Sequence, residues 1–433
     1  MQTTNYLQVG VIVGAIVLVT IAIMILTGFL PGLRESFTSG GTVIMWGFDS
    51  EDSFSDVFHS FGQAYRGSIV KYTKKNPVNF EDELLNAVAR GESPNLIVFP
   101  SDFFKKHKDI LASAPAITMT EREISQQFID SAQTFLGPKN EVMGIPIYAE
   151  TLQLYFNKDI FTENFVTLPP VTWDEVLNLS GKMTKKDDSG NILISGAALG
   201  RASNIKNATT ILTALLLQSG DPIFNQAGEI VFGDLPDGFK NTQLRPAESA
   251  LLFFSDFANP AKVAQSWSAA LPDSRDMFAA GKLAMYFGGN RDFDIIKTQN
   301  PHLNFAVAPL PQLSKNVVPI TSGVLYALAV PKASKNQNLS WALAKYLTSK
   351  DISTAYAKTK NDVSPRRDVL PAYSGDSVKS VFAGSILALN LWPNPDPDRS
   401  ENILRALIED VALGKGTIRE SIDRAKAKFN QKI

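Results

Sequence analysis

Thiol and imidazole side chains, which often bind metal ions or act as nucleophiles, are nearly absent from this chain of 433 residues. Cysteine is absent, and the three histidines, His59, His107 and His302, are far apart and match no metal-ligand spacing. The sequence therefore excludes disulfides, a thiolate metal site, a cysteine nucleophile and a lipid-modified cysteine. We expect no metal site.

Signatures of nucleotide-binding and hydrolytic enzymes are also missing. The pair at residues 414–415 (GK) is not a phosphate-binding loop, because Glu409 occupies the position of that loop's first glycine. No G-x-G-x-x-G follows a predicted strand, and neither H-E-x-x-H nor G-x-S-x-G occurs. We expect no cofactor and no enzymatic activity, although the 43 acidic residues leave open the carboxylate pair that glycoside hydrolases use.

The chain as a whole has a balanced charge. Its 42 basic and 43 acidic residues give a formal net charge of −1, so no global basic field would attract nucleic acid. Hydrophobic residues make up 44 % and charged residues 20 %, which excludes a mostly disordered chain. The length indicates about two or three domains.

The N-terminal region differs from this average composition. Residues 9–30 (VGVIVGAIVLVTIAIMILTGFL) carry no charge, and as a helix they would extend about 33 Å, the thickness of a bilayer's hydrocarbon core. A core helix is seldom apolar on every face over such a length, and a signal peptide has a shorter apolar stretch with a small-residue cleavage site. We expect residues 1–32 to form a single-pass anchor in the cell membrane, with the globular part extracytoplasmic.

Strands and helices alternate beyond a polar linker at residues 33–41. Runs of apolar and β-branched residues predict strands at 42–48, 69–73, 96–99, 145–148, 152–156, 282–287, 305–308 and 323–330. Helical spacing of apolar residues predicts helices between them, such as those at 79–91, 207–218 and 246–258. This alternation predicts an α/β fold, with a mainly parallel sheet and helices on both faces.

Five segments in this order resemble one protein family. The most specific is 144–159 (GIPIYAETLQLYFNKD), and the others are 170–175 (PVTWDE), 278–285 (FAAGKLAM), 301–311 (PHLNFAVAPLP) and 342–348 (ALAKYLT). Together they resemble the bacterial extracellular solute-binding proteins of family 1, the sugar-binding group. The resemblance spans roughly residues 42–430, which is the whole chain beyond the predicted anchor.

The resemblance implies a two-lobed periplasmic-binding-protein-like fold of type II. Each lobe would be a mainly parallel sheet flanked by helices, and hinge closure would trap the ligand between the lobes. The chain would cross between lobes near Tyr148, Gly288 and Gly323. The implied division is 42–148 plus 288–323 for lobe 1, and 149–287 plus 324–433 for lobe 2.

The resemblance also implies a function and partners. Such a protein captures a small solute, here a sugar or oligosaccharide, and delivers it to the permease subunits of an ABC importer. The missing phosphate loop agrees, because the importer's ATPase is a separate subunit. Members of the family often carry a lipid-modified cysteine, so residues 9–30 would replace the lipid as the tether to the bilayer here.

Polar residues that follow predicted strands are the first candidates for contact with a ligand. Open α/β sheets bind ligands beyond the carboxyl ends of their strands. Asp49, Ser50 and Glu51 follow the first strand, and Asp102 follows the third. Each of these could instead cap the helix that follows.

The resemblance adds candidates at the crossings and late in the chain. Glu150 matches an acidic sugar ligand of the family, with a hinge hydrogen bond or salt bridge as the alternative. Asn290 and Arg291 stand where the family places aromatic contacts, so Phe293 would have to supply the ring. Trp392 matches a late aromatic platform. Further candidates on the second lobe are Ser203, Asn204 and Trp267.

Two other classes of function remain open at the level of sequence. One is a membrane-anchored glycan-active enzyme, in which replacing Glu150 would abolish turnover. The other is a sensory or adhesion protein that reuses the binding fold. A sugar-binding importer component is the hypothesis that the ordered motifs favour.

Overall fold

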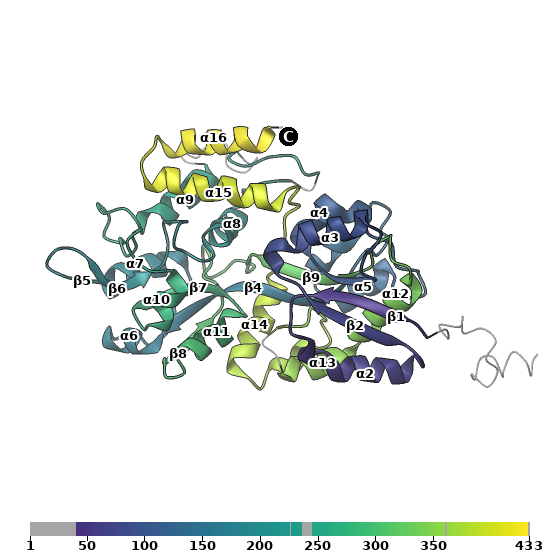
Figure 1. Cartoon of the computed structure of the whole chain (residues 1–433). Coiled ribbons are helices and arrows are strands. Elements are labelled where there is room, and N and C mark those ends of the chain that lie inside the picture. Colours follow the sequence, from purple (N-terminus) through teal and green to yellow (C-terminus); the bar gives the residue numbers. More distant parts are fainter. Residues whose placement is uncertain (1–39, 226, 236–244, 360–361, 432–433) are drawn as a thin grey trace, which may run out of the picture.

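A computed structural model of the chain describes residues 40–225, 227–235, 245–359 and 362–431 (Figure 1). Its strands are β1 (Thr42–Gly47), β2 (Ile69–Lys74), β3 (Leu96–Pro100), β4 (Ile145–Asn157), β5 (Lys185–Lys186), β6 (Ile192–Ala197), β7 (Leu283–Gly289), β8 (Phe305–Ala308) and β9 (Gly323–Ala329). Its α-helices are α2 (Ser55–Ala64), α3 (Phe80–Ala89), α4 (Ser101–His107), α5 (Glu121–Gln127), α6 (Lys158–Glu163), α7 (Trp173–Met183), α8 (Ala208–Gln218), α9 (Pro246–Asp256), α10 (Ser274–Ala279), α11 (Asp292–Gln299), α12 (Gln337–Leu347), α13 (Lys350–Thr359), α14 (Ser377–Leu387), α15 (Pro397–Ala412) and α16 (Ile418–Asn430). The predicted α/β class is confirmed.

The predicted membrane anchor at residues 9–30 lies outside the described residues. Within the ranges that the structure does describe, no helix is both long enough and apolar enough to cross a bilayer.

The strands form one extended sheet in the order β2-β1-β3-β9-β4-β7-β6-β5, with β8 also paired to β4. β4 changes partners along its length: residues 145–151 pair with β9, and residues 152–157 pair with β7 and β8. β4 therefore connects a first lobe, which contains β1, β2, β3 and β9, with a second lobe, which contains β5 to β8. Figure 1 shows β4 running from one lobe into the other.

The prediction of a mainly parallel sheet is wrong for this arrangement. Only the β1–β2, β1–β3 and β6–β7 pairs are parallel among the described strands, whereas β4 and β9 are antiparallel to all their partners. Alternating strands and helices suggest parallel neighbours only where each helix crosses back over the same sheet. Here β4 and β9 carry the chain between lobes in opposite directions, and their direction depends on long-range pairing.

Strand pairing also places two strands in lobes other than those expected. β9 pairs with β3, so residues 323–329 belong to the sheet of the first lobe, although 324–433 was expected in the second. β8 pairs with the second half of β4, so residues 305–308 belong to the second lobe and not to the first. The crossings expected near Tyr148 and Gly323 lie close to the change of partners, whereas the chain stays beside β7 after Gly288.

A single long strand replaces the two that were predicted around Glu150. Apart from Glu150 and Phe156, every residue of β4 is buried. A strand that is buried on both faces lacks the alternation of polar and apolar residues that marks strand ends. The sequence of β4 therefore does not show whether it forms one strand or two.

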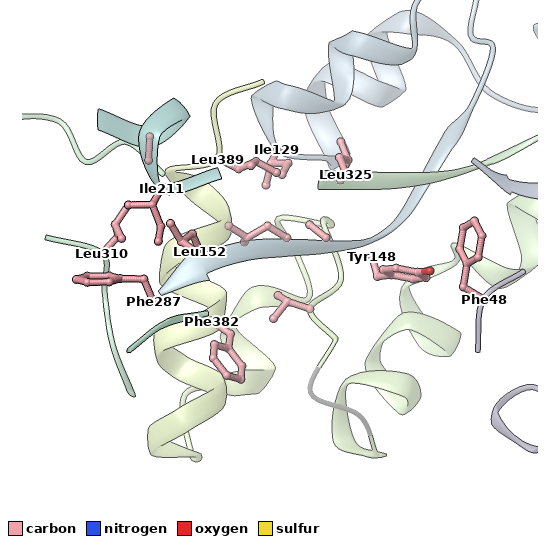
Figure 2. Close-up of a cluster of buried hydrophobic side chains, with 14 of the residues drawn as sticks. Phe48, Ile129, Tyr148, Leu152, Ile211, Phe287, Leu310, Leu325, Phe382 and Leu389 are labelled. Atoms are coloured by element: carbon pink, nitrogen blue, oxygen red, sulfur yellow. The ribbon is translucent and has the colours of Figure 1, made fainter. Parts of the chain in front are cut away.

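Buried apolar side chains pack along β4 where the lobes meet (Figure 2). Tyr148 lies toward the first lobe, with Phe48 beyond it, and Leu152 lies toward the second lobe, beside Phe287. Both β4 residues are at most 2 % exposed. Burial of large side chains contributes about 1.5–3 kcal/mol each, so this packing holds β4 firmly at the hinge.

Local signals set where the helices near the junction begin. The side chain of Thr172 accepts a hydrogen bond from Glu175 N and caps α7. α4 starts directly after β3, so Asp102 lies at the carboxyl end of that strand. Asp396 caps α15 by accepting a hydrogen bond from Arg399 N. These starts direct the first turns of α4 and α15 toward the junction between the lobes.

Candidate functional site

A cavity of about 330 Å³ lies between the two lobes, and we call it the interlobe cavity. The first lobe contributes Phe48, which follows β1, and Asp102 in α4. The second lobe contributes Thr209 and Thr213 of α8, and the segment before α15 contributes Trp392. Further lining residues are Pro77, Pro100, Phe103, Thr210, Ser322, Gly323, Val324, Tyr326, Asn390, Leu391, Asn394, Pro397, Asp398, Ser400, Glu401 and Leu404.

Aromatic rings from both lobes face this cavity. Phe48 and Tyr326 meet edge to face, with centroids 5.9 Å apart, on the side of the first lobe. Trp392 stacks on Phe224 with centroids 5.4 Å apart and planes 6° apart, on the side of the second lobe. Phe224 thus supports one face of the Trp392 indole, while Trp392 lines the cavity. The arrangement offers flat apolar surfaces to a ligand with apolar ring faces.

Asp102 is the carboxylate that the first lobe brings to the cavity. Its Oδ1 accepts a hydrogen bond of 3.4 Å from Ser101 Oγ. Burial raises the pKa of Asp102 to about 6, and the hydrogen bond from Ser101 opposes that rise. At neutral pH the carboxylate is mainly ionised and can accept hydrogen bonds from hydroxyl or amino groups.

Hydroxyl groups make up much of the opposite wall. Thr209 Oγ1 donates to Glu401 Oε2 at 2.5 Å, and Arg405 Nε binds Glu401 Oε1 at 2.8 Å. Ser322 Oγ donates to Thr210 O at 2.7 Å. Glu401 is therefore both hydrogen-bonded and neutralised by an arginine of its own helix.

A cluster of charged side chains lies at the hinge, and we call Asp49, Arg291 and Asp362 the hinge ion cluster. Arg291 binds Asp362 through Nε and Nη2 at 2.9 and 3.1 Å, and its Nη2 lies 3.1 Å from Asp49 Oδ1. Its guanidinium also lies 4.7 Å from the ring centroid of Tyr148. Burial alone would lower the pKa of Arg291, but Asp362, Tyr148 and Asp49 raise it above its usual range. Asp49 follows β1, Arg291 follows β7 and Asp362 follows α13, so the cluster joins three segments that are far apart in the sequence.

Glu150 lies on β4 opposite Val324, which lines the interlobe cavity. Burial raises the pKa of Glu150 from 4.5 to about 7; nearby Arg291 opposes the rise, and Asp292 and Asp362 add to it. Its Oε1 would lie 2.3 Å from a Cβ at Gly289, so any larger residue at the end of β7 would force the Glu150 side chain to move. Glu150 thus sits beside the hinge ion cluster and next to the cavity floor, and it is not among the residues that line the cavity.

The structure brings only some of the predicted ligand residues to the interlobe cavity. Asp102 and Trp392 line it. Asp49 is bound by Arg291, immediately after the lining residue Phe48. Ser50 and Glu51 are exposed, and Ser50 Oγ lies 3.0 Å from Ser53 Oγ.

Ser203, Asn204 and Trp267 hold loops of the second lobe together and do not line the cavity. Trp267 is fully buried, and its Nε1 donates to Asn204 Oδ1 at 2.9 Å. Asn204 Nδ2 donates to the backbone oxygens of Ser268 and Leu271. The exposed Ser203 donates its backbone N–H to Glu409.

Asn290 and Phe293 support the hinge and also lie outside the cavity lining. Asn290 is 1 % exposed; its Oδ1 accepts from Thr151 N at 3.0 Å, and its Nδ2 donates to Ala149 O at 3.3 Å. The Asn290 amide therefore makes hydrogen bonds to the β4 backbone just beyond the point where β7 stops pairing with β4. Phe293 packs against Phe305 with centroids 5.3 Å apart, within the second lobe.

Sequence reasoning missed most of the cavity lining. Phe48 ends the first predicted strand, so the rule that pointed to Asp49 could have included it. Thr209, Thr210 and Thr213 interrupt an otherwise apolar helix, and that was the available signal for them. Tyr326 had no signal, because β9 was placed in the other lobe.

No group of three or more histidine, cysteine, aspartate or glutamate side chains that could hold a metal ion occurs among the described residues. The arrangement suits reversible binding of a polar, ring-containing small molecule, with aromatic faces, hydroxyls and one ionised carboxylate as contacts.

Comparison with known proteins places the chain among binding proteins. A putative binding protein of Brucella abortus is 23 % identical over 301 residues, 68 % of each chain. The galactooligosaccharide-binding protein of Bacillus subtilis is 21 % identical over 402 residues, 90 % of this chain and 89 % of that protein. The crystal structure of an ABC transporter solute-binding protein from Thermotoga lettingae, bound with alpha-D-tagatose, superposes with a TM-score of 0.71 at 24 % identity, covering 90 % of this chain and 99 % of that one.

These likenesses confirm the two-lobed α/β fold that the motifs implied. The family model described as bacterial extracellular solute-binding protein matches residues 56–380, which is well over half of the sequence. The chain therefore belongs to the bacterial extracellular solute-binding protein family.

Proposed function

We propose that this protein captures a sugar or oligosaccharide in the interlobe cavity and delivers it to the permease of an ABC importer, without acting on it as an enzyme. The observation that carries the proposal is the cavity lining, which combines Trp392, Phe48 and Tyr326 with several hydroxyl groups and Asp102. Sugars present apolar ring faces to aromatic side chains and hydroxyls to carboxylates and hydroxyls.

The relatives support a carbohydrate as the ligand. The Bacillus subtilis protein is named for galactooligosaccharides, and the Thermotoga lettingae structure holds alpha-D-tagatose. A third relative, from Pyrococcus abyssi, is named a maltotriose-binding protein and is 22 % identical over 328 residues. At such identities, we transfer the class of ligand and not a particular sugar.

Contacts across the mouth of the cavity support capture by closure of the lobes. Lys106 Nζ of α4 lies 3.7 Å from Asp396 Oδ1, at the start of α15 in the second lobe. Lys105 Nζ lies 3.2 Å from the position that a Cβ would take on Gly228, also in the second lobe. Lobes in contact at this rim enclose the cavity, and hinge opening about β4 would admit the solute.

We further propose that residues 9–30 tether the protein to the outer face of the cell membrane as an uncleaved helix. Their length and lack of charge support this role. A membrane-held binding protein would stay close to its permease, where it need not diffuse freely between captures.

Isothermal titration calorimetry of the full chain in detergent, against a panel of neutral oligosaccharides, tests the proposed ligand class. We expect at least one sugar to bind with a dissociation constant at or below the micromolar range. Binding of peptides or polyamines with no binding of any sugar would overturn the carbohydrate assignment. Release of reducing ends during the titration would instead favour a glycan-active enzyme.

A further inference from the structure

We infer that the interlobe cavity accepts sugars that carry no anionic group and rejects uronates and sugar phosphates. The inference deepens the proposed function and rests on it. It depends on three features of the structure: which charged groups line the cavity, how Lys106 and Arg291 near the cavity are already paired, and what the remaining lining can bind.

The described lining residues carry carboxylates and no cationic side chain. Asp102, Asp398 and Glu401 are the charged lining residues, and no lysine, arginine or histidine accompanies them in the described part of the lining. Glu401 is paired with Arg405 at 2.8 Å, and its side chain is 45 % exposed, so water screens its charge. Asp398 is exposed at the start of α15, where water screens it. Asp102 is thus the carboxylate whose charge acts inside the cavity.

Two of the cations near the cavity are already bound by carboxylates. Lys106 Nζ, at the mouth, lies 2.6 Å from Glu81 Oε1 and 3.7 Å from Asp396 Oδ1. Arg291, at the hinge, is held by Asp362 and Asp49 in the hinge ion cluster. An anionic ligand could use Lys106 or Arg291 as a counter-charge only by breaking these ion pairs, which would leave another carboxylate without its partner.

A ligand group with hydroxyls meets no such obstacle. Asp102 accepts hydrogen bonds from hydroxyl groups without a change in charge. The hydroxyl oxygens of Thr209 and Ser322, which already donate to Glu401 and Thr210 O, can accept further hydrogen bonds from the ligand. A carboxylate or phosphate on the ligand would instead face Asp102 as a like charge. Two like charges held close together in a binding site weaken binding by more than a single hydrogen bond strengthens it. This repulsion therefore discriminates against an anionic ligand.

Calorimetry with matched pairs of sugars tests the inference. The probes are maltotriose, mannobiose and galactobiose, each beside the counterpart in which the terminal CH₂OH is oxidised to a carboxylate. For any neutral probe that binds, we expect the oxidised counterpart to bind at least tenfold more weakly at pH 7.5. Asp102→Asn should reduce that difference to less than threefold, because the amide removes the charge and keeps the shape of the side chain.

A matched control separates this local effect from the overall charge of the protein. Asp109→Asn removes one carboxylate from an exposed position just beyond α4, and it should leave the tenfold difference intact. Equal binding of a neutral sugar and its oxidised counterpart, or a difference that survives in Asp102→Asn, would overturn the inference while leaving the proposed function in place. Failure of every neutral sugar to bind would overturn both.

Discussion

Replacing Glu150 by glutamine should change how the stability of this protein depends on pH. In the folded chain, burial raises the pKa of Glu150 to about 7 from its ordinary value of 4.5. Between these two values the folded state binds more protons than the unfolded state. The free energy of unfolding therefore falls as the pH rises through this window. Glutamine does not titrate, so the Glu150→Gln variant should lack this part of the fall.

The size of the effect follows from the raised pKa. The interval from 4.5 to about 7 corresponds to at most about 3 kcal/mol. Glu150 remains partly exposed to solvent, and solvent screening reduces the effect. We expect about 1–2 kcal/mol of difference between the two proteins to develop from pH 4.5 to pH 8.

Urea unfolding of both ligand-free proteins at pH 4.5, 6 and 8 measures this difference, since the other titrating groups are common to both. The free energy of unfolding of the variant, minus that of the parent, should rise with pH. Glu92→Gln is the control, because the Glu92 carboxylate pairs with Arg90 at an exposed position and its replacement should change the free energy of unfolding by less than about 1 kcal/mol at each pH. Parallel pH profiles for the parent and Glu150→Gln would refute the reasoning that burial at the hinge opposes ionisation of this side chain.

Three further substitutions test other parts of the structure. Arg291→Met leaves the carboxylates of the hinge ion cluster without their cation and should lower the free energy of unfolding by about 3 kcal/mol in urea titrations; a change below about 0.5 kcal/mol would contradict the cluster's role. Trp392→Ala removes an aromatic face from the cavity and should weaken sugar binding about tenfold or more by calorimetry. Lys106→Met removes the contact with Asp396 across the mouth and should speed sugar release severalfold in stopped-flow fluorescence, whereas an unchanged release rate would show that this contact does not hold the lobes closed.

Local sequence patterns predicted the α/β class, most of the strands and helices such as α3, α8 and α9. Such features depend on neighbouring residues, for example the cap that Thr172 makes with Glu175 N. The rule that ligands bind beyond the carboxyl ends of strands also placed Asp102 at the cavity, because α4 follows β3 directly. Each of these predictions needs only the residues next to the one in question.

The sequence did not show what surrounds each candidate side chain in the folded protein. Trp267 and Asn204 have the side chains that a sugar site uses, yet they bind each other inside the second lobe. Asn290 serves β4 as a hydrogen-bonding partner. A polar or aromatic residue type shows what a side chain can bind, and only the packing around it shows what it does bind.

The sequence by itself determined the α/β class, the family and an apolar segment long enough to cross a membrane, because local spacing and short motifs carry that information. Tertiary structure alone decided the antiparallel pairing of β4 with β9, the meeting of Asp49 and Asp362 at Arg291, and the lining that Tyr326 and Trp392 share. These contacts join segments far apart in the chain, and their free energy depends on long-range pairing and burial. No local pattern records such contacts.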